Sequence, residues 1–176
     1  MKTIYTVGHS TRTIEQFLEL LKAHNIQEVV DVRTIPKSRR NPQFSEDQLP
    51  SALKQAGIEY THLGKLGGLR RTAKDSINVG WQNSSFRGFA DYMATDEFQQ
   101  GLQELKELAE KKTVAIMCAE AVSWRCHRSL IADTLTMQGW QVLHIQSRKT
   151  AKPHEVTPFL KVSDGKLIYP PLEEEG

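Results

Sequence analysis

A short apolar segment, Val114-Ala-Ile-Met-Cys118, has the length and composition of a buried strand, and it ends in a thiol. The next residues, Ala119-Glu-Ala-Val-Ser-Trp-Arg-Cys-His-Arg128, lead into a second apolar segment. This pattern predicts a strand, a loop and a helix from about Cys126 to Gln138, stopped by Gly139. Cys118 would then stand at the carboxyl end of a strand, where α/β proteins bind their ligands.

Four further segments have the same form, in that a strand-like run meets a polar or ionisable side chain at its carboxyl end. They are Ile4-Tyr-Thr-Val-Gly-His9, Val29-Val-Asp-Val-Arg33, Ile58-Glu-Tyr-Thr-His62 and Val142-Leu-His144. Because parallel strands end at one edge of a sheet, we expect this edge to collect His9, Asp31, Arg33, His62, Cys118, Glu120 and, by extension, His144.

Between these segments the chain has helical patterns, so we predict one α/β domain over residues 1–176. It would have three layers, with a mainly parallel sheet of about five strands flanked by helices. Thr13-Ile-Glu-Gln16 has capping-box spacing and predicts a helix to about His24, with Asn25 as a left-handed stop. Ser45-Glu-Asp-Gln48 offers a second capping box, for a short helix over about residues 46–56 that Pro50 limits.

Three other regions complete the expected organisation. Residues 64–87 form a long polar segment with embedded aromatic side chains, which predicts a lid or binding loop. A helical turn over Phe89 to Ala94 and a helix capped by Thr95 follow. Residues 146–176 are expected to be a largely irregular tail with a short edge strand at Leu167 to Tyr169 and an acidic end, Glu173-Glu-Glu175.

Composition narrows the class of protein. The formal net charge is only +2, so overall charge does not predict a polyanion as partner. No apolar run reaches the length of a membrane span, and the amino terminus lacks the pattern of an export signal. Cys118 and Cys126 are the two cysteines, too few for a disulfide framework. We therefore expect a cytoplasmic protein with reduced thiols and no membrane partner.

The segment around Cys126 could act on a substrate in two ways. A thiol at a helix amino terminus is acidified by unpaired amides, and the same position can hold a phosphate with Arg125 or Arg128 as a clamp. A buried structural cysteine is the alternative. An arginine six residues after the cysteine, as in cysteine phosphatases, is missing, because those positions are Trp124 and Ala132.

The Val-Asp-Val-Arg33 segment and the order of strand, cysteine, loop and helix resemble those of rhodanese-like sulfurtransferases. Cys118 is similar in placement to their persulfide-carrying cysteine. Glu120 does not fit the anion-binding loop of cysteine phosphatases or of rhodanese-like sulfurtransferases, because its carboxylate would repel an anion bound in the loop. It would suit a general acid or base beside a sugar or nucleobase.

The remaining candidates are mostly residues suited to binding phosphate or a base. We expect Asp31 to form an ion pair with Arg33 rather than to orient His9. Two basic groups, Arg33 to Arg40 and Arg70 to Lys74, could contact phosphates, and aromatic side chains including Trp124 could stack on a base or pack in a lid. The predicted catalytic residues are His9, Cys118, Glu120 and Cys126. The predicted substrate-binding residues are Ser10, Asp31, Arg33, Arg39, His62, Arg70, Trp81, Arg87, His127 and Arg128.

We predict no cofactor. A divalent metal is the less favoured alternative, because Cys-x7-Cys-His is not a zinc-binding spacing and adjacent helical residues point in different directions.

Five separated motifs together resemble the prokaryotic domain-of-unknown-function family 488. They are Thr6-Val-Gly-His-Ser10; Val30-Asp-Val-Arg33 with Pro36 and Ser38-Arg39; Tyr60-Thr-His-Leu63 with Leu66-Gly-Gly68; Phe86-Arg-Gly-Phe-Ala-Asp-Tyr-Met93; and Cys118-Ala-Glu120 with Cys126-His-Arg128. The resemblance implies a single domain and supports the same edge residues, but it implies no particular reaction.

Three functions are therefore expected from the residues, in order of preference. The first is an enzyme that acts on a phosphate-bearing substrate, a nucleotide or nucleic acid, at the carboxyl ends of the strands. The second is a non-catalytic module that binds DNA or RNA. The third is a rhodanese-like protein of thiol or sulfur transfer centred on Cys118.

Overall fold

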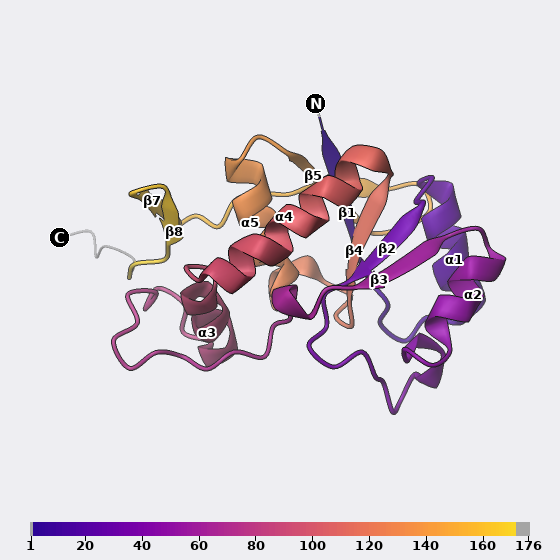
Figure 1. The fold of residues 1–176 in the computed structure, drawn as a ribbon, viewed down its shortest axis with the longest axis horizontal. Helices are drawn as coiled ribbons and strands as arrows, with labels where there is room; N and C mark the ends of the chain where they lie inside the picture. Colours follow the sequence, from indigo (N-terminus) through magenta and orange to yellow (C-terminus); the bar gives the residue numbers. More distant parts are fainter. Residues whose placement is uncertain (1, 172–176) are drawn as a thin grey trace.

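A computed structural model describes residues 2–171 and contains a sheet of six strands, five of them parallel (Figure 1). In order across the sheet, the strands are β3 (Glu59–His62), β2 (Glu28–Asp31), β4 (Val114–Cys118), β1 (Thr3–Gly8), β5 (Gln141–Ile145) and β6 (Ala151–Pro153). β6 pairs antiparallel with β5 at one edge. The predicted parallel α/β sheet is confirmed, with one strand more than the five that the sequence patterns indicated.

Helices cover both faces of the sheet, which confirms the three-layer architecture (Figure 1). The α-helices are α1 (Ile14–Ala23), α2 (Leu49–Gln55), α3 (Ser84–Tyr92), α4 (Asp96–Lys111) and α5 (Arg128–Met137). α1 and α2 bury apolar side chains against one face, and α3, α4 and α5 against the other. Three short 3₁₀ helices occur in the loops: η1 (Pro42–Phe44), η2 (Gly64–Leu66) and η3 (Ser123–Arg125).

The helix starts follow the local chemistry of the chain. The predicted capping box of α1 is present, since Thr13 accepts from the Gln16 amide and the Gln16 side chain accepts from the Thr13 amide. Asn25 has a left-handed backbone with φ of 58°, as expected for a stop. The predicted start of α2 at about residue 46 is wrong, because α2 begins at Leu49.

The physical reason is that Ser45 has another partner. Its hydroxyl accepts from the Ser38 amide at 3.0 Å, which closes the preceding loop instead of capping a helix. α2 then starts where Pro50 lies in the first turn, a position whose amide needs no helical acceptor.

The long segment before α3 is held by one carboxylate. Asp91 accepts from the Ala73 amide, the Ser76 hydroxyl and the Asn78 side-chain amide, at 2.6–2.9 Å. Trp81 packs edge to face against Phe86 in α3, with ring centroids 5.0 Å apart. The segment is thus an ordered cover on the side of the sheet that carries α3 to α5.

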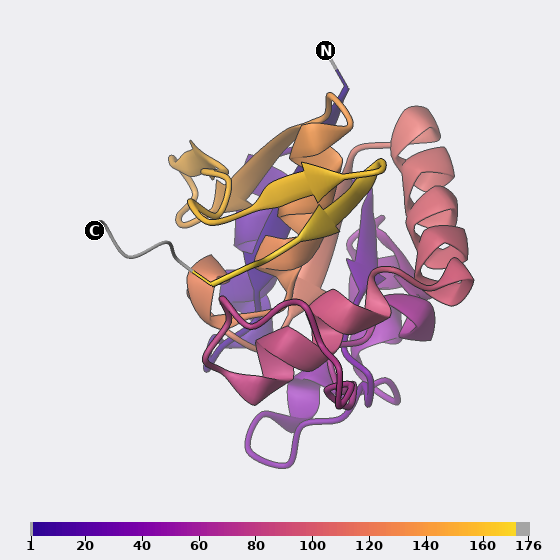
Figure 2. The ribbon, with the colours of Figure 1, turned by 90° about the vertical axis from the view of Figure 1, so that its left-hand side faces the viewer.

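The carboxyl-terminal part of the chain contributes more strand than predicted. Besides β6 it forms a hairpin of β7 (Lys161–Ser163) and β8 (Lys166–Ile168), which lies on the same side of the molecule as α3 and the covering segment (Figure 2). Tyr169 then anchors the chain, because its amide donates to Asn78 and its hydroxyl to Asp133. The predicted acidic tail, Glu173-Glu-Glu175, lies outside the described residues.

Pairing between β1 and β4 continues past the strands. The His9 amide donates to the Cys118 carbonyl at 2.9 Å, and the Ser10 amide donates to the Ala119 carbonyl at 3.0 Å. The loop after β4 therefore lies directly over the end of β1. This close approach requires Gly8, since a Cβ atom there would overlap the Glu120 carbonyl group.

None of the helices in residues 2–171 combines the length and the apolar character needed to cross a bilayer.

We predict that Gly8→Ala lowers the free energy of unfolding by roughly 1–3 kcal/mol, because the added methyl group overlaps backbone atoms that cannot move aside as a side chain can. Urea denaturation measures the effect. Gly64→Ala is the matched control, since its Cβ would have one neighbour, the His62 ring at 3.6 Å. Equal stability of the two variants would show that the loop does not rest on β1 as described.

Candidate active site

A topological switch point lies between β1 and β4, at the carboxyl edge of the sheet. These strands are neighbours, yet the helix after β1 packs on one face and the helix after β4 packs on the other. Their connections separate at this point and leave a crevice, which is the usual ligand site of open parallel sheets. Cys118 ends β4 there, and His9 follows β1.

A cavity of about 340 Å³ lies at this edge, next to β2 and β4. We call it the edge cavity. It is lined by Arg33, Thr34, Ile35, Lys37, Gly68, Leu69, Ser85, Phe86, Cys118, Ala119, Glu120, Arg125, Cys126 and His127. Both thiols, the exposed Glu120 carboxylate and three cations thus share one space.

The two thiols differ in their protonation. Both are buried, and the Cys118 thiol donates to the Glu120 carbonyl at 3.5 Å. Burial opposes ionisation of Cys118, but the neighbouring Cys126 thiol and the positive charge of Arg128 outweigh it, so the pKa of Cys118 is lowered. Burial, followed by the neighbouring Cys118 thiol, raises the pKa of Cys126 well above its usual value. Cys118 is therefore the more acidic of the two thiols.

His127 is held as a neutral imidazole beside Cys126. Its Nε2 lies 2.8 Å from the Val32 carbonyl and 3.0 Å from the Leu66 carbonyl, so Nε2 carries the proton that both oxygens accept. Nδ1 is then an acceptor, 3.5 Å from the Cys126 sulfur. Burial lowers the pKa of His127 to about 4. Together these contacts orient the Cys126 thiol, whose proton is donated to Nδ1 of His127.

Arg128 is a buried cation without a carboxylate partner among residues 2–171. It is 1 % exposed, and Nη2 donates to the Ala121 carbonyl, whereas Nε and Nη1 have no protein acceptor. Its field reaches Cys118, and it also lowers the pKa of Arg12, where burial is the larger cause. A buried unpaired charge is costly, so Arg128 favours any neighbour that becomes negative.

Arg33 is in the opposite situation. The predicted ion pair with Asp31 is confirmed: Nη2 and Nε of Arg33 donate to the Asp31 carboxylate at 2.7 and 2.9 Å. Tyr60 also donates to that carboxylate, and Arg33 donates to the Phe44 carbonyl. Because its charge is compensated and its donors are largely occupied, Arg33 forms part of the cavity wall rather than a free anion site.

His9 lies against Arg33 of this ion pair, on the side away from the edge cavity. It is 2 % exposed and does not line the edge cavity. Its Nδ1 donates to the Ser10 carbonyl, its Nε2 faces Arg33 at 3.5 Å, and its ring stacks on Phe44 with centroids 4.4 Å apart. Burial is the main cause that lowers its pKa. This geometry suits a positioning residue.

Several predicted binding residues hold the covering segment instead of lining the edge cavity. Arg70 lies over the Tyr92 ring at 3.7 Å and donates to two glycine carbonyls, and Arg87 donates to the Trp81 carbonyl. His62 bonds to the Arg33 carbonyl at 2.7 Å. Arg39 lines a separate surface hollow with Glu46.

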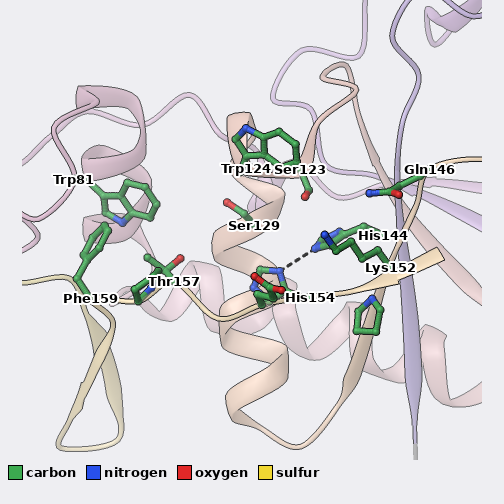
Figure 3. A pocket seen from close by; sticks show the side chains of 13 residues that line it. Trp81, Ser123, Trp124, Ser129, His144, Gln146, Lys152, His154, Thr157 and Phe159 are labelled. Atoms are coloured by element: carbon green, nitrogen blue, oxygen red, sulfur yellow. Dashed lines mark hydrogen bonds between the residues drawn. The ribbon is translucent and has the colours of Figure 1, made fainter. Parts of the chain in front are cut away.

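A second cavity, also of about 340 Å³, lies on the other side of η3 (Figure 3). We call it the aromatic cavity. Its walls include Trp81, Ser123, Trp124, Ser129, His144, Gln146, Lys152, Pro153, His154, Glu155, Thr157, Pro158 and Phe159. Of these residues, the sequence indicated only Trp81, Trp124 and His144 as possible ligand contacts.

A buried chain of polar groups runs along this cavity and was missed from the sequence. Asp133 accepts from Nε2 of His154 at 2.7 Å, His154 Nδ1 lies 2.8 Å from His144 Nε2, and His144 Nδ1 lies 2.5 Å from the Thr6 hydroxyl. Burial lowers the pKa of His144 to about 3. The one available signal was an acid, Asp133, within the apolar pattern of α5.

In residues 2–171, no three His, Cys, Asp or Glu side chains converge as a metal site would require.

We predict that iodoacetamide labels Cys118 with an apparent pKa below the ~8.5 of a free thiol, and that Cys126 stays unlabelled at neutral pH. Labelling rates against pH, resolved by peptide mass spectrometry, measure both. Cys126→Ala removes the neighbouring thiol that lowers the pKa of Cys118 and should raise that pKa, whereas Cys126→Ser keeps a polar group there and should change it less. Faster labelling of Cys126 would reverse the assignment.

Comparison with known proteins gives a family match. Residues 13–135 match the family described as Domain of unknown function DUF488. Neither the curated proteins nor the solved structures contain a match to this chain. The matched region begins at the N-cap of α1 and ends within α5. It therefore includes both thiols and the cations of the edge cavity. The chain is a member of the DUF488 family.

Proposed function

We propose that this protein is a cytoplasmic enzyme that uses Cys118 as a nucleophile on a phosphate-bearing substrate, a nucleotide or nucleic acid, in the edge cavity. The observation that carries the proposal is the pairing of a thiol of lowered pKa with a buried arginine that has no carboxylate partner in the described chain. A thiolate is the reactive form of cysteine, so these contacts favour nucleophilic chemistry.

Burying the charge of Arg128 costs desolvation free energy, and an apolar side chain could fill the same space without that cost. Replacing a buried charge by an apolar side chain of similar size often leaves stability unchanged or improves it. An uncompensated guanidinium whose field lowers the pKa of Cys118 is therefore best explained by that effect. The neighbouring Cys126 thiol lowers the pKa of Cys118 as well.

The cavity also carries groups suited to the substrate. Since Asp31 neutralises Arg33, the cations left for a phosphate are Lys37 and Arg125, and neither has an ion pair within residues 2–171. Glu120 is exposed in the same cavity. A carboxylic acid in that position is suited to protonate a leaving oxygen.

The proposed reaction has two steps. In the first, the Cys118 sulfur bonds to phosphorus, the bond from phosphorus to the leaving oxygen breaks, and that oxygen takes a proton from Glu120. In the second, water attacks phosphorus, Glu120 takes the proton of the water, and the sulfur–phosphorus bond breaks to return the thiolate. The net reaction is hydrolysis of a phosphate ester, and another acceptor in place of water would make the enzyme a transferase.

We expect Cys118→Ser to reduce hydrolysis of an aryl phosphate or of nucleotides at least about a thousand-fold, because the nucleophile is lost. Glu120→Gln should lower kcat with little change in substrate affinity. Acid quenching followed by mass spectrometry should detect a phosphorylated Cys118 peptide in the wild type. Full activity of Cys118→Ser would refute the mechanism.

Arg128→Met tests the electrostatic part separately. We expect a free energy of unfolding equal to or above that of the wild type, since a buried unpaired charge is removed, together with a raised pKa of Cys118 and slower turnover. Urea denaturation and pH-dependent labelling measure the two quantities. A loss of more than about 3 kcal/mol with unchanged thiol reactivity would mark Arg128 as purely structural.

Two other functions have specific support. The adjacent thiols at the end of β4 favour sulfur transfer, which predicts that Cys118 accepts sulfane sulfur from thiosulfate and that Cys118→Ser cannot. The exposed cations Lys37, Arg39 and Arg40 favour nucleic-acid binding without catalysis. That function predicts salt-dependent binding of DNA or RNA that is lost with Arg39→Ala and unaffected by Glu120→Gln.

A further inference from the structure

The two cavities are separated by one turn of chain. Ser123 and Trp124 of η3 line the aromatic cavity, whereas Arg125, the last residue of η3, lines the edge cavity. The cavities also meet at a pair of rings. Trp81 lines the aromatic cavity, and its edge-to-face partner Phe86 lines the edge cavity. A ligand that reaches over η3 can therefore place one part in each cavity.

Five of the thirteen residues that line the aromatic cavity carry an aromatic ring. Figure 3 shows Trp124 at one margin, Trp81 with Phe159 at one end, and His144 toward the other end. The indole of Trp124 is 66 % exposed, a large apolar ring that the fold itself leaves uncovered. Such a ring beside a cavity is suited to stack on a flat ligand.

The histidines of this cavity do not act as free hydrogen-bonding groups. Both nitrogens of His144 and both nitrogens of His154 are engaged, with Thr6, with each other and with Asp133. They therefore offer the cavity ring surface rather than lone pairs. The polar chain fixes two more rings in place, and Asp133 is itself held by Thr157 and Tyr169.

One buried donor in the cavity wall lacks an acceptor. Nε1 of Trp81 has no hydrogen-bond partner within residues 2–171. Figure 3 shows this nitrogen on the side of the indole that faces Phe159 and Thr157, which line the same cavity. The ring of Trp81 packs edge to face against Phe159, with centroids 4.9 Å apart, so this buried nitrogen fixes the wall of the cavity rather than offering a donor to its interior.

Charge favours a phosphate on the edge-cavity side of η3. The aromatic cavity itself is lined by one cation, Lys152, and one carboxylate, Glu155, whose charges oppose each other. Arg125 lines the edge cavity immediately across η3 and would attract a phosphate there. A ring in the aromatic cavity with its phosphate across η3 therefore fits this distribution of charge.

We propose that the aromatic cavity is the nucleobase subsite, in which a base stacks on Trp124 while its phosphate lies across η3 beside Arg125 and Cys118. This inference rests on the proposed function, because it names the base-bearing part of the phosphate substrate. The cavity of about 340 Å³ is at the lower end of the range for small-molecule sites, which suits one base rather than an oligonucleotide segment.

The test uses ligands that separate the two cavities. Adenosine and cytidine probe the aromatic cavity without a phosphate, inorganic phosphate probes the edge cavity, and the corresponding 5′-monophosphates probe both. Isothermal titration and quenching of tryptophan fluorescence measure binding to the full chain. We expect nucleosides to bind, and the monophosphates to bind more tightly than either part alone.

Variants at Trp124 identify the stacking residue. Its side chain is largely exposed, so its replacement should leave the fold intact. Trp124→Ala should weaken nucleoside binding about ten-fold or more, whereas Trp124→Phe keeps a ring and should weaken it only about three-fold. Neither variant should change phosphate binding. Val162→Ala, which also shortens an exposed apolar side chain, is the matched control and should change nothing.

Several outcomes would overturn the proposal. These are undetectable nucleoside binding to the wild type, nucleoside binding unaffected by Trp124→Ala, or tight binding of tetramethylammonium in place of nucleosides. Short single-stranded DNA serves as a further arm: equal per-base affinity for a mononucleotide and for DNA supports a single-base subsite, and binding of DNA alone contradicts it. Loss of turnover in every assay, with nucleoside binding intact, would refute the enzymatic function while leaving the base subsite standing.

Discussion

The continuation of the β1–β4 ladder past the ends of both strands determines the geometry of the candidate active site. The amides of His9 and Ser10 donate to the carbonyls of Cys118 and Ala119, so the loop after β4 is held against the end of β1. This arrangement is possible because Gly8 has no side chain to occupy the space. From there the chain turns toward α5 and brings Cys126 back to Cys118, although eight positions separate them in sequence.

Two buried arginines show how the fold distributes charge at this edge. Arg33 is enclosed by Asp31, a carbonyl and the stacked His9, and its charge is compensated within the protein. Arg128 has a single carbonyl partner and no carboxylate among the described residues. The same type of side chain is thus part of the cavity wall in one place and a source of uncompensated positive potential in the other. Only the second arrangement can acidify a neighbouring thiol.

The histidines differ in a similar way. His9, predicted as an acid or base, is buried behind the edge cavity with both nitrogens engaged. His127, predicted as a binding residue, faces Cys126 with its unprotonated nitrogen. His144 belongs to a chain of polar groups that also includes His154, which the sequence did not single out. A carbonyl partner decides which nitrogen carries the proton in His9 and His127, and the Asp133 carboxylate does so in His154, whose Nδ1 then accepts from His144.

The local pattern of the sequence was sufficient for the parallel α/β class, the capping box of α1 and the gathering of polar residues at one sheet edge, since each depends on neighbours within a few residues or on strand direction alone. The folded chain was needed for the strand order, the later start of α2, the division of the edge into two cavities, and the different protonation of Cys118 and Cys126. These features depend on interactions between different segments: Ser45 bonds to Ser38, Trp81 packs on Phe159, and the charge of Arg128 acts on Cys118. Desolvation and the field of a buried charge act through space, and the distances that set their size exist only once the chain has folded.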